Sequence, residues 1–193
     1  MIQDFSAITA FIVETEKLKS VERRIKPVGF QRYENSAEHS WQIALLSMTL
    51  LPYAQEAADP LTVVTMLLLH DIVEIDTGDK FAYHSNHDDF ENEHAAAKRI
   101  FSLLPEALNS KYLQIWEEFE AAQSAEAKFA KAIDRLMPVL QNLHNGCQSW
   151  LEHQITINQI LTKNAAIEIA NPQLWQWVKQ QVISTGRLAG LKD

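Results

Sequence analysis

Cysteine, glycine and proline are all scarce in this sequence of 193 residues, which contains one Cys, five Gly and six Pro. The single cysteine, Cys147, excludes a disulfide within the chain and is typical of a reducing compartment such as the cytoplasm. The shortage of helix-breaking residues, together with abundant Ala, Leu, Ile, Glu and Gln, favours a mostly helical protein. The length suits one domain, which we expect to cover residues 1–193.

Positive charge and long apolar runs are lacking as well. Seventeen Lys and Arg oppose 25 Asp and Glu, and the resulting net charge of −8 argues against a surface that binds nucleic acid. No apolar run reaches the roughly 18 residues that a membrane-spanning helix needs. Residues 1–19 contain Asp4, Glu14 and Glu16 and are therefore not expected to be a signal peptide. We expect a cytoplasmic protein with neither membrane nor nucleic-acid partners.

Apolar periodicity predicts an all-α fold of about seven or eight helices, because no segment has the pattern of a strand. The first helix should cover Asp4–Lys19, with Phe5, Phe11 and Ile12 among the apolar residues on one side of it. Further helices are predicted at about 90–104, 111–122 and 125–143. The core should span about residues 18–140, with the C-terminal helices packed on it.

Three helix starts are marked by capping residues. Asn35 is expected to cap a helix that Pro52 kinks or ends, with Glu38 completing a variant of the capping box. Asp59-Pro60 should open the next helix, and Asn171-Pro172 the last one. The last helix carries Trp175 and Trp177, which fit either the core or a dimer surface.

An adjacent histidine and aspartate, His70-Asp71, follow the apolar run Met66–Leu69. His39 upstream and Asp134 downstream also lie in helix-forming sequence. Three helices that bring these four side chains together would form a site for one divalent metal ion, and imidazoles with carboxylates suit Mn, Co, Zn, Ni or Fe. A lone histidine on an apolar helix face is more often a core residue with one hydrogen bond, so this alternative stays open.

Two short segments carry three of the four candidate ligands: residues 34–40 read ENSAEHS and residues 70–79 read HDIVEIDTGD. Together with Asp134, they resemble the HD-domain phosphohydrolase superfamily, and especially its branch of bacterial 5′-deoxynucleotidases and related HD hydrolases. The resemblance implies a helical HD domain in which His39, His70, Asp71 and Asp134 bind the metal ion.

The resemblance also implies roles for two more acidic residues and for an arginine pair. Glu74 would orient the attacking water or accept its proton, with Asp79 as a second acid near the substrate. Arg24 occupies the position of an arginine that contacts the nucleotide phosphate in the deoxynucleotidase branch, and Arg23 is a weaker candidate of the same kind. A guanidinium can bind phosphate through two hydrogen bonds, whereas the alternative is a solvated basic loop. Ile25 stands where that branch has a tryptophan against the sugar, which puts deoxyribose selectivity in question.

The implied activity is release of phosphate from nucleoside or deoxynucleoside 5′-monophosphates, and the family also suggests a homodimer. One alternative is hydrolysis of another phosphorylated nucleotide, such as a triphosphate or a cyclic or alarmone nucleotide. The other is a non-catalytic regulatory module in which the metal ion only stabilises the fold. His84, His87 and His94 lie in polar, acidic sequence and are expected at the surface rather than in a second metal site.

Overall fold

The structure, a computed structural model, describes residues 2–83 and 89–193, and this part is helical without a β-strand. His84 and His87, which the sequence analysis expects at the surface, lie outside the described residues. The seven long helices are α1 (Ile2–Thr15), α2 (Ser36–Leu50), α3 (Pro60–Leu69), α5 (Asp89–Phe101), α6 (Glu106–Ala121), α7 (Ala125–His144) and α11 (Pro172–Ala189). The four short helices are α4 (Glu74–Thr77), α8 (Gln148–Glu152), α9 (Ile157–Lys163) and α10 (Ile167–Ala170). The all-α prediction is confirmed, with more short helices than expected.

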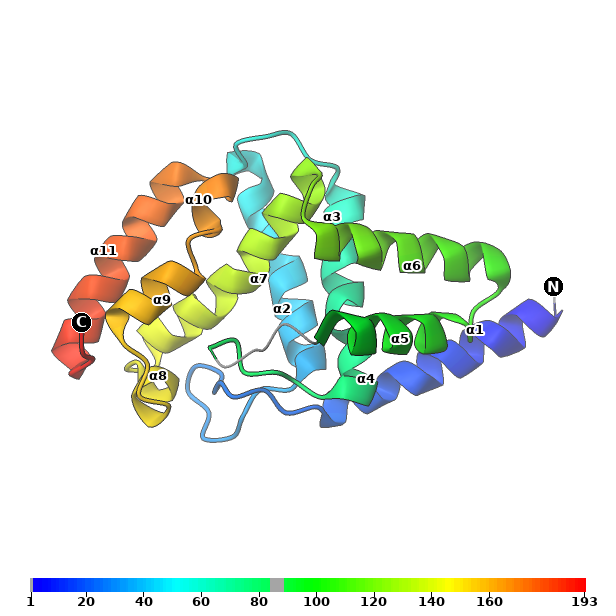
Figure 1. Cartoon of the computed structure of the whole chain (residues 1–193), viewed down its shortest axis with the longest axis horizontal. Helices are drawn as coiled ribbons and strands as arrows, with labels where there is room; N and C mark the ends of the chain where they lie inside the picture. Colours follow the sequence, from blue (N-terminus) through cyan, green and yellow to red (C-terminus); the bar gives the residue numbers. More distant parts are fainter. Residues whose placement is uncertain (1, 84–88) are drawn as a thin grey trace.

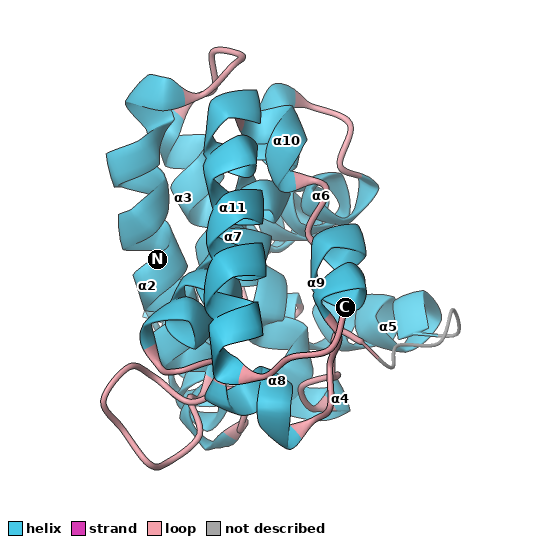
Figure 2. Ribbon diagram, turned by 90° about the vertical axis from the view of Figure 1, so that its left-hand side faces the viewer, coloured by secondary structure: helices cyan, strands magenta, loops and turns pink. Residues whose placement is uncertain are grey.

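Helix α7 is the centre of the fold (Figure 1). It packs against α2, α3 and α6, and also against α10 and α11. One apolar cluster joins α7 to α2 and α3 around Ile43 and Met66, and a second joins it to the C-terminal helices around Ile160 and Val178. Figure 2 shows α11 lying along α7. Trp175 is buried in the second cluster, so this tryptophan belongs to the core.

A third apolar cluster holds the segment that follows α3. It joins α1, α5 and α6 to the 3₁₀ turn His70–Val73 around Phe101 and Trp116. The indole Nε1 of Trp116 donates a hydrogen bond of 3.1 Å to the backbone carbonyl of His70. The histidine–aspartate pair is therefore fixed by packing on one side and faces α2 and α7 on the other.

The predicted helix starts are confirmed at their capping residues. The Asn35 side chain accepts a hydrogen bond from the Glu38 amide, and the Glu38 carboxylate accepts one from the Asn35 amide. Asp59 caps α3 and Asn171 caps α11 through the same kind of side-chain contact. Helix α2 ends at Leu50, just before Pro52, as the missing amide of proline requires.

Two predictions about helices were wrong. Helix α1 ends at Thr15 rather than Lys19, and the 3₁₀ turn Glu16–Ser20 follows it. Helix α1 packs mainly against this turn and α5, which leaves Phe5 and Ile12 62% and 55% exposed. Helix α6 begins at Glu106 rather than 111, since Pro105 stands at its N-terminal boundary. Among the described residues, no helix is both long and apolar enough to span a membrane.

Candidate metal centre

Three elements bring the four predicted ligands together. His39 lies in the first turn of α2, His70 and Asp71 lie in the 3₁₀ turn after α3, and Asp134 lies in the middle of α7. His39 Nε2 is 3.0 Å from Asp134 Oδ1 and 4.0 Å from Asp71 Oδ2. His70 Nε2 is 3.0 Å from Asp71 Oδ1 and 3.7 Å from Asp134 Oδ1. His39, His70 and Asp71 also form a group whose potential ligand atoms all lie within 4.8 Å of one another.

These separations fit a single metal ion. Ligand atoms bonded to one ion at about 2.0–2.2 Å lie roughly 3 to 4 Å from one another. His70 Nδ1 lies 2.9 Å from the Leu67 carbonyl oxygen, which can only accept, so Nδ1 carries a proton and Nε2 is the nitrogen available to a metal ion. Within the described part of the chain, that buried Nε2 makes no hydrogen bond. A histidine oriented in this way through its other nitrogen is typical of metal ligands.

The charges around the two histidines and Asp71 favour a positive charge between these side chains. Burial alone would lower the pKa of His70, but Asp71 and Asp134 raise it to about 10. Burial, with help from Arg23, lowers the pKa of His39 to about 4, so this imidazole stays neutral and able to act as a ligand. Burial opposes ionisation of Asp71 too, yet His70 and Arg23 keep its pKa at about 2. The ionised carboxylates therefore favour positive charge beside His70 Nε2, which either a proton or a metal ion can supply.

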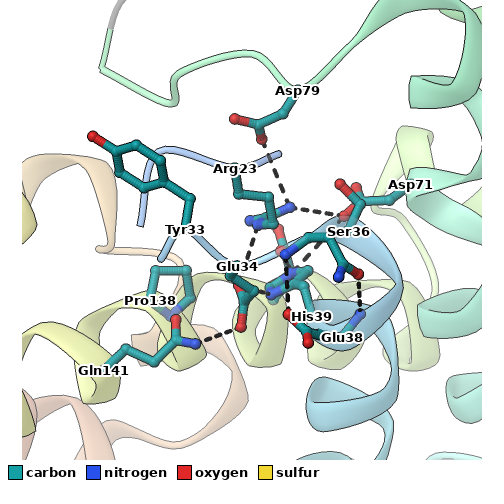
Figure 3. A network of polar contacts seen from close by, with 12 residues as sticks. Arg23, Tyr33, Glu34, Ser36, Glu38, His39, Asp71, Asp79, Pro138 and Gln141 are labelled. Atoms are coloured by element: carbon teal, nitrogen blue, oxygen red, sulfur yellow. Dashed lines mark hydrogen bonds and ion pairs between the residues drawn. The ribbon is translucent and has the colours of Figure 1, made fainter. Parts of the chain in front are cut away.

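Arg23 lies beside this centre in a network of acidic side chains (Figure 3). Its Nη1 is 2.8 Å from Asp71 Oδ2 and 3.8 Å from Asp79 Oδ1, and its Nε is 3.4 Å from Glu34 Oε2. The side chain is only 12% exposed. The structure therefore places Arg23 among the acids of the centre rather than free in solvent.

Replacing Arg23 with glutamine is expected to lower the free energy of unfolding by about 3 kcal/mol, because several buried acids would lose their positive partner. The matched control is Arg24→Gln, which removes the same group from the next, exposed position and should leave stability nearly unchanged. Urea unfolding of the metal-stripped proteins measures both effects. Equal stability of the two variants would show that the network does not stabilise the fold.

Glu74 begins α4, directly after the 3₁₀ turn His70–Val73. Its Oε2 accepts a hydrogen bond of 2.5 Å from the Ser36 hydroxyl at the start of α2. Burial and the charge of Asp71 raise the pKa of Glu74 well above its ordinary value. A 3₁₀ turn rather than a continuous α-helix joins His70 to Glu74, and it places Glu74 in the wall of the same cavity as Asp71 and Asp134.

A cavity of about 410 Å³ opens from the centre. Asp79 lines it just after Gly78, whose positive φ of 71° ends α4, and burial raises the pKa of Asp79. Arg24 lines the same cavity, with its guanidinium carbon 5.8 Å from the centroid of the Phe81 ring. Ile25, which the resemblance places against the sugar, also lines the cavity. The wall further includes residues that the sequence analysis did not single out, among them Lys80, Arg135, Trp150 and Lys163.

Glu34 and Gln141 are two further residues of the centre that the sequence analysis missed as functional positions. Glu34 is 1% exposed, accepts a hydrogen bond from the Gln141 amide and faces His39 Nδ1 at 3.6 Å. Burial raises the pKa of Glu34 to about 7. Gln141 lies seven residues after Asp134, two turns along the same face of α7, and this spacing could have identified it.

His94 is not part of a second metal site in the described residues. It lies 2.8 Å from Glu117 and stacks on Trp116, and no other group of three potential ligands occurs within residues 2–83 and 89–193. The expectation that His94 lies at the surface is borne out in part, since its side chain is 21% exposed.

Comparison with known proteins places the chain in a family. Residues 15–175 match the HD domain family. The human protein named 5′-deoxynucleotidase HDDC2 is 30% identical over 153 residues, which cover 78% of this chain and 72% of the human one. The 5′-deoxynucleotidase of Erwinia tasmaniensis is 27% identical, over 72% of this chain and 76% of its own length. A solved structure described as a predicted metal-dependent phosphohydrolase from Magnetospirillum magnetotacticum has a TM-score of 0.93 at 38% identity, covering 99% of this chain and 100% of that one.

The chain therefore belongs to the HD domain family of metal-dependent phosphohydrolases. Both the family and the helical fold were expected from the sequence resemblance, and both are confirmed.

Proposed function

We propose that this protein is a 5′-nucleotidase, which releases inorganic phosphate from nucleoside 5′-monophosphates, including deoxynucleotides. The proposal rests on one observation: four potential ligands of one ion meet beside a cavity of about 410 Å³ whose wall also contains Glu74 and Asp79. Such a volume is typical of pockets for small molecules. The names of the human and Erwinia relatives support the choice of substrate. The single cysteine supports a cytoplasmic location.

In this proposal one divalent ion is held by His39, His70, Asp71 and Asp134, and the mixed nitrogen and oxygen ligands suit Mn, Co, Zn, Ni or Fe. When bound, the ion would polarise a phosphoryl oxygen and make a water molecule acidic enough to react near neutral pH. Glu74 lies close to these ligands and its raised pKa suits it to take up a proton.

Glu74 is held in position by the hydroxyl of Ser36, which donates to its carboxylate. In the proposed reaction Glu74 accepts the proton of the attacking water. The bond between phosphorus and the 5′-oxygen breaks, and the products are a nucleoside and inorganic phosphate. Asp79, whose pKa burial also raises, is the second group in the cavity able to carry a proton, here to the leaving 5′-oxygen.

Arg24 and Ile25 are the residues of the cavity that bear on substrate choice. Arg24 is exposed and positively charged, and it remains our candidate for a contact to the nucleotide phosphate. Ile25 is buried in the cavity wall and has no aromatic ring to stack against a sugar. We therefore expect ribonucleotides to be hydrolysed along with deoxynucleotides.

Initial rates on nucleoside 5′-monophosphates and 5′-triphosphates, measured side by side, test the proposed substrate. We expect monophosphates to be preferred. A preference for triphosphates would favour another HD hydrolase activity. A metal ion that raises the melting temperature while no phosphoester is turned over would favour the regulatory module.

We further propose that two copies of the chain associate through the outer faces of α2 and α3. These adjacent helices expose five large apolar side chains, each at least 46% accessible: Trp41, Leu45, Met48, Leu61 and Leu68. Glu38 is the only Asp, Glu, Lys or Arg in the two helices. Because each copy carries a net charge of −8, an uncharged apolar face is where two copies meet with least repulsion.

Replacing Leu45 with glutamate is expected to convert the dimer into a monomer, because a symmetric interface would bury the new charge twice. Sedimentation should give twice 22.0 kDa for the unmodified chain and 22.0 kDa for the variant. Ile169→Glu is the matched control, since Ile169 is 53% exposed on α10, which is not part of the proposed interface. A wild-type monomer, or a Leu45→Glu dimer, would contradict this interface.

A further inference from the structure

Arg135 and Lys163 are two positively charged residues of the cavity wall that no role assigned so far uses. Arg135 follows Asp134 on α7, and Lys163 is the last residue of α9. The Nε of Arg135 is 4.0 Å from Asp134 Oδ2, and its side chain is 31% exposed. Lys163 is half-buried, and among the described residues it has no ion pair. Helices α7 and α9, which lie far from Arg24 in the sequence, therefore bring two more positive charges to the cavity.

The chain provides little negative charge to balance this pair. Arg135 and Lys163 line the same cavity. Burial and the charge of Arg135 lower the pKa of Lys163, and the charge of Asp134 opposes this shift. Two other acids of the cavity wall are already paired, Glu93 with Lys80 and Glu120 with Lys131, each at 3.0 Å. Asp134, the nearest acid, directs its other oxygen toward the two histidines.

Two cations in the wall of one cavity are a usual composition of an anion site. Arg135 adjoins a candidate metal ligand, so an anion that contacts it would lie next to the metal centre as well. The group that must lie there during phosphoester hydrolysis is the phosphoryl group.

We propose that Arg135 and Lys163 form a phosphate-binding site beside the metal centre. This site holds the phosphoryl group during attack and inorganic phosphate after it. The identity of the substrate rests on the proposed function, whereas binding of phosphate itself does not. Arg24 comes from the loop before α2, so its contribution can be measured independently.

Calorimetric titration of the Mn²⁺-loaded protein with inorganic phosphate tests the site. Arg135→Gln and Lys163→Gln should each weaken phosphate binding about tenfold, the effect of losing one charged hydrogen bond. The same variants should raise KM for a deoxynucleoside 5′-monophosphate, while metal content stays unchanged. Arg135→Lys should restore most of the phosphate binding, which a purely structural role of Arg135 would not predict. Lys179→Gln on α11, which removes a lysine outside the cavity, is the control.

Unchanged phosphate affinity in both glutamine variants would overturn the inference, and Lys163→Gln decides the matter if Arg135→Gln does not fold. If the wild type hydrolyses nucleotides and both glutamine variants keep its KM and phosphate affinity, the proposed function stands and the phosphate-binding site is refuted. Loss of phosphate binding in the variants of a protein that hydrolyses no nucleotide would support the site and refute the proposed function.

Discussion

Replacing Asp71 with alanine is expected to remove the metal ion and lower the rate of phosphate release at least about 1000-fold, a loss of about 4 kcal/mol of transition-state stabilisation. Asp71 lies between the two histidines, 3.0 Å from His70 Nε2 and 4.0 Å from His39 Nε2. Its low pKa keeps it ionised at any pH near neutrality. Metal analysis of the purified variant and initial rates measure the two losses.

Asp76→Ala is the matched control for Asp71. Asp76 lies five residues later on α4, where its carboxylate binds Arg99 at 2.7 Å rather than lining the cavity. This variant should retain both metal and activity. An Asp71→Ala protein that keeps its metal ion and its rate would show that the centre lies elsewhere.

Replacing Glu74 with glutamine is expected to lower kcat by a factor of about 10² to 10⁴, the usual contribution of a group that transfers a proton. Glutamine has nearly the same shape, and its oxygen can still accept the hydrogen bond from Ser36. The metal content and KM should therefore stay close to those of the wild type. This pattern separates Glu74 from Asp71, whose loss removes the metal as well.

Glu91→Gln, an exposed position on α5, is the control for Glu74 and should leave kcat unchanged. If Glu74→Gln loses its metal together with its activity, Glu74 is a ligand and another group accepts the proton. Asp79, which also lines the cavity, would then be the first candidate.

Features that depend on local chemistry could be predicted from the sequence. Asn35 and Glu38 form their capping box within four residues, so nothing distant decides whether α2 begins there. The start of α2 in turn fixes the place of His39 in its first turn. The grouping of His39 with His70, Asp71 and Asp134 was expected because two motifs at this separation resemble a known superfamily.

Features that depend on distant contacts could not be predicted. Arg23 and Arg24 are neighbouring residues of the same type. Packing nevertheless buries Arg23 among three acids and leaves Arg24 exposed. Arg135 and Lys163 come from separate helices, and only the packing of α9 near α7 brings both to the same cavity. The apolar residues of α1 had the spacing of a helix face that packs on a core, but Phe5 and Ile12 stay largely exposed within the part of the chain that the structure describes.

The most direct test of the central claim is phosphate release from deoxynucleoside 5′-monophosphates by the metal-stripped protein, with Mn, Co, Zn, Ni or Fe added back one at a time. We expect no release without metal, release with at least one of these ions, and none from Asp71→Ala under the same conditions. Equal release with and without metal, or no release with any ion, would contradict a nucleotidase that acts through His39, His70, Asp71 and Asp134.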